Sequence, residues 1–214
     1  MADRIIVINP NSTAAVTADI SIALDSLRAD PNVEFECLTL TEGPPGIETQ
    51  RHVDSVVVPL CRMIEKCDNR ASAFVLACFS DPGLHMARET TRKPVLGIAE
   101  SGLLTALTLG DRIGVIAILA GSIPRHSRFF RTMGIEDRIA GEYPVELGVT
   151  ELADENVTFA RMTEVSKRLA DEKGYDVKVL FTRRDGTFNI IPVNTLEASD
   201  VPWNGHQGQA VSNT

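Results

Sequence analysis

The stretch that most constrains the fold is a short apolar run that ends abruptly in a turn. Residues 72–77 (SAFVLA) are almost entirely apolar, as in a strand that is buried on both faces of a sheet. Cys78 follows this strand, and Asp81, Pro82 and Gly83 then force a turn. Asp81 and Pro82 suit the N-cap and first position of a helix. The segment therefore predicts a βα unit with a thiol at the carboxyl end of its strand.

This position makes Cys78 a candidate functional residue. Ligands of open α/β sheets bind beyond the carboxyl ends of the strands, and N–H groups at a helix N-terminus favour a thiolate. The structural alternative is that Cys78 packs as a small hydrophobe, as most free cysteines do. The residue pattern leaves both roles open. The other cysteines (Cys37, Cys61 and Cys67) are expected in the core, and no metal site is expected from their spacing.

Strand-like and helix-like segments alternate along the chain as far as residue 181. Strands are predicted at 4–8, 33–40, 72–77, 94–98, 111–118, 139–145 and 176–181, and the main helices at 14–27, 48–66, 100–108 and 154–171. This alternation predicts an α/β fold with parallel sheets. Because the pattern repeats on either side of Gly97, we expect two similar lobes, residues 1–97 and 98–181, with a cleft between them and the second lobe incomplete. A single sheet fits the same pattern nearly as well.

The alternation breaks after Phe181. Asp185-Gly186 is typical of a hairpin turn, and residues 188–193 suit a returning edge strand. Hydrophobic periodicity is weak from residue 194 onward, and residues 205–214 have the composition of a disordered tail. We therefore treat residues 182–214 as an atypical end, with a hairpin followed by a disordered tail.

The acidic composition argues against some partners. The formal net charge is −8 and no basic stripe interrupts it, so nucleic acid is not an expected partner. No apolar run is long enough to cross a membrane. A strand-like run begins directly after the first residues, with no secretory signal. These features predict a cytoplasmic protein with reduced thiols.

Three separated segments carry recognisable motifs: RIIVINPNST (4–13), ACFSDPGL (77–84) and PVLGIAESGLLTALTLGDRIGVI (94–116). In sequence and in order they resemble the aspartate/glutamate/hydantoin racemase superfamily, and most of all its hydantoin and allantoin racemase branch. The resemblance covers residues 4–180. It implies a cofactor-independent isomerase with two α/β lobes, in which one cysteine from each lobe faces a small-molecule substrate. Family members are commonly oligomers, which leaves a homo-oligomer open.

The resemblance also implies roles for particular residues. Cys78 corresponds to the catalytic cysteine of the first lobe. Substrate binding is implied for the side chains of Asn9, Asn11 and Ser12, the backbone N–H groups of Phe79 and Ser80, and Ser101 at a helix start, where capping is an equal alternative. Racemases of acidic amino acids carry a polar residue directly after the cysteine. Phe79 at that position favours a cyclic ureide.

Such a site would abstract the proton α to a carbonyl. N–H donors stabilise the enolate-like charge, while a thiol on each face of the substrate removes or returns the proton. The second thiol is missing here, because Thr182 stands where the family carries its second cysteine. A hydroxyl is too weak an acid to replace it. We hypothesise that the chain after residue 181 departs from the ancestral ending through a frameshift or a truncated gene. The frameshift explanation fails if neither other reading frame encodes a Gly-Cys-Ala-Gly-like turn and a helix.

Several functions stay open at this point. We favour a racemase or epimerase acting on a hydantoin, allantoin or amino-acid-like substrate, impaired by the missing thiol. A one-thiol lyase and an inactive homologue that binds small anions are alternatives. A cysteine hydrolase would need a positioned histidine. His85 is expected to point away from the strand end, and the remaining histidines (His52, His126 and His206) are interpreted as surface residues. Dinucleotide binding is disfavoured, because the first βα turn lacks a glycine-rich sequence.

Overall fold

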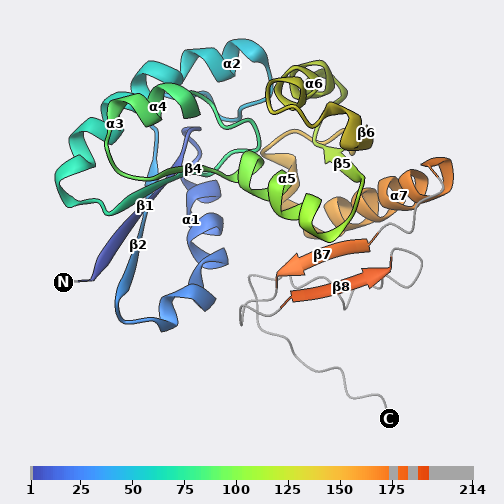
Figure 1. Cartoon of the computed structure of the whole chain (residues 1–214), viewed down its shortest axis with the longest axis horizontal. Coiled ribbons are helices and arrows are strands. Elements are labelled where there is room, and N and C mark those ends of the chain that lie inside the picture. Colours follow the sequence, from blue (N-terminus) through green and yellow to red (C-terminus); the bar gives the residue numbers. More distant parts are fainter. Residues whose placement is uncertain (1, 174–177, 183–187, 193–214) are drawn as a thin grey trace.

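Two groups of strands and helices lie side by side in the computed structural model, which describes residues 2–173, 178–182 and 188–192 (Figure 1). The first group contains a four-stranded parallel sheet in the order β2-β1-β3-β4. Its strands are β1 (Asp3–Asn9), β2 (Val33–Thr39), β3 (Ala73–Leu76) and β4 (Val95–Gly97). The residue pairs along β1 show that its carboxyl end lies beside the carboxyl ends of β2 and β3.

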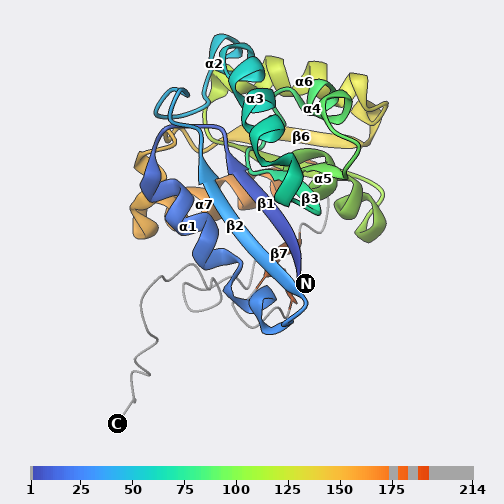
Figure 2. The same ribbon diagram turned by 90° about the vertical axis from the view of Figure 1, so that its left-hand side faces the viewer.

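Helices cover both faces of this sheet. Helix α1 (Ala14–Ala23) lies on one face, whereas α3 (Val57–Cys67) and α4 (Leu84–Thr90) lie on the other (Figures 1 and 2). The core between the sheet and α3 includes Ile6, Ile8, Phe74, Leu76, Leu60 and Ile64. Because these side chains are fully buried, their removal from water is a main source of stability for this lobe.

The helix predicted over residues 48–66 is divided in two. Helix α2 (Gln50–Ser55) ends before Val56, and α3 starts at Val57. Pro59 explains the break, because it has no N–H to donate to Ser55 and its ring crowds that carbonyl. The helix predicted over residues 14–27 also ends early, at Ala23, and a separate 3₁₀ turn follows (Asp25–Ala29).

The second lobe is built on a two-stranded parallel sheet. Its elements are α5 (Ile98–Leu109), β5 (Ile113–Ala117), α6 (Ile123–Thr132), β6 (Ile139–Pro144) and α7 (Glu155–Lys173). Val115 packs against Leu103 of α5 and Phe130 of α6. The neighbouring residue Ile116 points to the opposite face, where it packs against α7. Parallel sheets in two lobes confirm the predicted α/β architecture.

A separate antiparallel pair follows the second lobe. β7 (Lys178–Thr182) pairs with β8 (Phe188–Pro192). Among the described residues, neither strand joins the parallel sheets. The tail predicted to be disordered, residues 205–214, lies outside the described residues.

The two lobes are connected beside the carboxyl ends of the strands. The Glu48 side chain accepts a hydrogen bond from the backbone N–H of Val149 at 2.9 Å. The Arg128 guanidinium on α6 donates to the Gln50 side chain at 2.9 Å. The loop that follows β2 therefore holds the second lobe across the space between the two sheets.

Candidate active site

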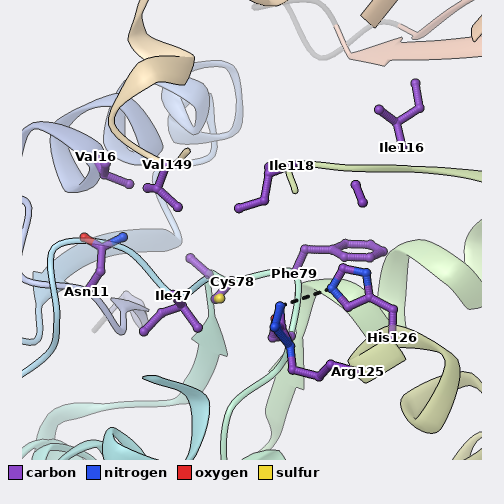
Figure 3. A pocket seen from close by; sticks show the side chains of 13 residues that line it. Asn11, Val16, Ile47, Cys78, Phe79, Ile116, Ile118, Arg125, His126 and Val149 are labelled. Atoms are coloured by element: carbon purple, nitrogen blue, oxygen red, sulfur yellow. Dashed lines mark hydrogen bonds between the residues drawn. The ribbon is translucent and has the colours of Figure 1, made fainter. Parts of the chain in front are cut away.

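A cavity of about 190 Å³ lies between the two lobes (Figure 3). The first lobe contributes Asn11, Val16, Ile47 and residues 77–80, and the second contributes residues 116–118, Arg125, His126 and Val149. Three of these segments directly follow the ends of β1, β3 and β5. A mostly apolar wall with a few polar groups is typical of a small-molecule site.

Cys78 reaches the cavity from the first lobe, directly after β3. Burial, together with the nearby Asp81 carboxylate, raises the pKa of its thiol from 9.0 to about 12. The charge of Arg125 and hydrogen bonds from Ser80 act in the opposite direction but are outweighed. The surroundings of Cys78 therefore oppose the thiolate that the sequence led us to expect.

Asp81 contributes to the raised pKa of Cys78. It also caps a different helix from the one predicted. Its carboxylate accepts hydrogen bonds from the N–H groups of Ala99 at 3.0 Å and Glu100 at 2.7 Å, at the start of α5. Helix α4 is capped instead by Gly83, which has a φ of +70°. The turn after Cys78 therefore places a buried carboxylate near the sulfur, and the N-terminus of α4 lies several residues further along.

Arg125 lies on α6 and is only 8% exposed. Its Nη2 donates to the Ser80 hydroxyl at 3.1 Å and contacts His126 Nε2 at 3.4 Å, while its Nη1 reaches the Glu48 carbonyl at 3.5 Å. The buried Nε has no hydrogen-bond partner. Burial lowers the pKa of Arg125, because the charged form loses hydration.

His126 is also buried, at 5% exposed, so its interpretation as a surface residue is wrong. Its Nδ1 forms a hydrogen bond with the Glu142 carboxylate on β6. The ring of Phe79 packs against it edge to face, with 5.5 Å between the ring centroids. The sequence contains one signal for this burial, because His126 lies on the same helical face as Phe130.

The structure brings only some of the predicted binding residues to the cavity wall. Asn11, Phe79 and Ser80 line the cavity, whereas Asn9, Ser12 and Ser101 are not among its lining residues. The buried Asn9 side chain instead holds its loop, donating to the side chains of Asn11 at 2.9 Å and Thr17 at 3.0 Å. The Ser80 N–H donates to the Cys78 carbonyl at 2.7 Å.

One predicted position remains, at the end of β7. Thr182 is the last residue of β7, and its side chain is outside the described part.

Among the described residues, no group of three or more His, Cys, Asp or Glu side chains could hold a metal ion. No helix described here has the length and apolar character needed to cross a membrane.

Together these features define a two-lobed α/β protein with a thiol in a mostly apolar cavity between the lobes. Residues 5–180 match the Asp/Glu/Hydantoin racemase family, and the chain belongs to that family. The predicted resemblance to this superfamily is therefore confirmed.

Individual relatives agree with this assignment. A hydantoin racemase from Pseudomonas sp. (strain NS671) is 31% identical over 179 residues, which is 83% of this chain and 72% of that protein. The structure of allantoin racemase from Klebsiella pneumoniae is 27% identical, with a TM-score of 0.75 over 81% of this chain and 71% of that one. Allantoin racemase from Pseudomonas fluorescens has the same fold, with a TM-score of 0.74 and 24% identity.

Proposed function

We propose that this chain exchanges the proton α to a carbonyl in a hydantoin, allantoin or amino-acid-like substrate, without a cofactor, through Cys78. The observation that supports this most directly is the Cys78 thiol on the wall of the inter-lobe cavity. Hydantoin racemases and allantoin racemases among the similar proteins support the same class of reaction.

In this proposal the Cys78 thiolate removes the α-proton. The S–H bond forms as the C–H bond breaks, and the electron pair moves onto the carbonyl oxygen as an enolate. Ionising a thiol with a pKa of about 12 is unfavourable at neutral pH, but the resulting thiolate is a correspondingly strong base. The positive charge of Arg125 reduces the cost of ionisation. Return of the proton from the thiol, or of a solvent proton that has exchanged with it, completes the cycle.

Substitution of the thiol tests the proposal. One enantiomer of a 5-substituted hydantoin is incubated in deuterated water, and loss of the α-proton signal is followed by NMR. We expect Cys78→Ser to slow exchange by at least ~100-fold, because a hydroxyl is a much weaker acid than a thiol. Cys37→Ser is the matched control, since Cys37 is on β2 and does not line the cavity. Exchange by Cys78→Ser at the wild-type rate would contradict a catalytic role for this residue.

A second candidate function has one observation in its favour. The guanidinium of Arg125 is buried and its Nε has no hydrogen-bond partner. An inactive protein that binds small anions would need such a group. Such a protein would be stabilised by its ligand, but the wild-type chain would show no isotope exchange. The NMR experiment therefore separates the two candidates.

A further inference from the structure

We infer that the Arg125 guanidinium recognises a carboxylate of the ligand, so that the cavity prefers small ureido acids to neutral ureide rings. This inference rests on the proposed function for the location of the site and names its substrate class more narrowly. It concerns binding, however, and does not depend on the proton chemistry of Cys78.

The first argument is the burial of a charge that lacks a direct ion pair. Arg125 is 8% exposed, and a buried guanidinium normally pairs with a carboxylate. Among the described residues, no carboxylate lies within ion-pair distance of it. Its direct contacts are a carbonyl, a hydroxyl and an imidazole, and the Glu142 carboxylate acts on it only from beyond His126. A bound carboxylate would supply the direct partner.

The second argument is donor capacity. Nε has no partner, and Nη1 makes one long contact, at 3.5 Å, although it carries two hydrogens. Burial of donors without partners is unfavourable. The guanidinium is therefore not saturated by the protein, and a carboxylate is the acceptor whose geometry suits a planar cation best.

The third argument is that the cation is held in place. In the neutral tautomer that donates from Nδ1 to the Glu142 carboxylate, Nε2 of His126 is the acceptor for Arg125. The Ser80 hydroxyl holds the same Nη2 from the other lobe. Glu142, His126 and Ser80 thus fix the guanidinium before a ligand arrives, which reduces the entropy lost on binding.

The proposed carboxylate site at Arg125 has a defined position relative to the Cys78 thiol. Figure 3 shows the Arg125 guanidinium on the same side of the cavity as the Cys78 sulfur, with the Phe79 and His126 rings beyond it. The wall opposite is apolar and includes Ile118 and Val149. A small ligand anchored by its carboxylate at Arg125 would therefore lie against Cys78 and direct its less polar part towards these side chains.

The test compares two probes related by ring opening, which turns a ring carbonyl into a carboxylate. Hydantoate (the N-carbamoylglycine anion) and its neutral cyclic form, hydantoin, are titrated calorimetrically into the full chain at pH 7. We expect hydantoate to bind at least ~10-fold more tightly, as for a charged hydrogen bond in a buried site. Equal binding of the two probes by the wild-type chain overturns the inference.

Two variants on one helix identify the responsible cation. Arg125→Gln is expected to weaken hydantoate binding at least ~10-fold and to remove the preference over hydantoin. Arg131→Gln is the matched control, because Arg131 is exposed on the same helix, pairs with Glu136 of its own lobe and does not line the cavity. It should bind both probes like the wild type. Arg125→Gln binding hydantoate with wild-type affinity would also overturn the inference.

Folding and catalysis have separate readouts. Without ligand, Arg125→Gln should melt at a higher temperature than the wild type, because it removes an unpaired buried charge. If Arg125→Gln does not fold, the comparison of hydantoate with hydantoin on the wild-type chain still tests the inference. Cys78→Ser should keep the hydantoate preference even though it loses exchange. A preference without exchange therefore refutes only the proposed function, and exchange without a preference refutes only this inference.

Discussion

Cys78 lies between a carboxylate and a guanidinium, yet burial has the larger effect on its pKa. Its thiol should therefore react slowly at neutral pH. We expect the rate of alkylation by iodoacetamide to rise about tenfold per pH unit from pH 7 to pH 10 without a plateau, because only the thiolate reacts and the pKa is about 12. Mass spectrometry of the peptide that contains Cys78 measures this rate. A plateau near pH 8 would show that the thiol is already ionised there.

Arg125 provides the control for that measurement. Since its charge lowers the pKa of the Cys78 thiol, Arg125→Gln should slow alkylation at every pH in this range. Arg131→Gln should leave the profile unchanged, because Arg131 is exposed and does not line the cavity.

Among the residues of the candidate site, the sequence allowed Cys78 to be predicted but not Arg125 or His126. Cys78 could be predicted, because an apolar strand followed by a turn fixes its position along the chain. Arg125 and His126 were missed because both residue types are usually exposed. Their burial depends on how α6 packs against the first lobe, and the pattern within α6 cannot encode that contact. His126 beside Phe130 on one helical face was the only local sign.

Among the helices, α5 depends on a residue from a distant turn. The Asp81 carboxylate satisfies two N–H groups in its first turn, which would otherwise lack partners. We expect Asp81→Ala to lower the free energy of unfolding by about 1–2 kcal/mol, as for the loss of a helix cap. Urea unfolding followed by circular dichroism measures the change. A variant as stable as the wild type would show that solvent replaces this cap.

Two glycines provide a matched pair for the same contact. A Cβ at Gly97 would lie 2.2 Å from Cγ of Asp81, whereas a Cβ at Gly102 has no neighbour within 4 Å. Gly97→Ala should therefore destabilise the protein by about 1–3 kcal/mol. Gly102→Ala should stabilise it by up to about 1 kcal/mol, because Gly102 lies within α5 and alanine favours a helix. The same urea experiment tests both.

The sequence predicted these elements better than their ends and partners. The parallel strands of both lobes were expected from their apolar runs, but the order β2-β1-β3-β4 depends on contacts between distant segments. The single helix predicted over residues 48–66 overlooked the effect of Pro59. Asp81 was assigned to the nearest helix because a local pattern does not reveal a cap that acts across 18 residues.

For the whole molecule, the division of the site between lobes determines the expected stereochemistry. Cys78 is on the first-lobe wall and is the only thiol that lines the cavity among the described residues. A proton returned by this thiol arrives on the face from which it left. We therefore expect exchange in deuterated water to be roughly tenfold faster than inversion, or more. NMR measures exchange, and chiral chromatography of the same samples measures inversion. Equal rates would require an acid on the second-lobe wall.

The repeated strand and helix pattern allowed the two lobes to be predicted, because each repeat needs its own buried face. The cavity between them was expected only as a cleft, and its polar side chains could not be selected from the sequence. The hydrogen bonds from Val149 to Glu48 and from Arg128 to Gln50 join residues from different lobes. Such contacts follow from docking of the lobes, and no periodicity within either segment indicates them.

The bond between Asp81 and α5 also has a mechanical consequence. It attaches the turn behind the sulfur to the first helix of the neighbouring lobe, so a tilt of that helix would shift the sulfur as well. Any widening of the space between the lobes that involves α5 is thus transmitted to the sulfur. Admission of a ligand and alignment of the sulfur would then be two results of one motion.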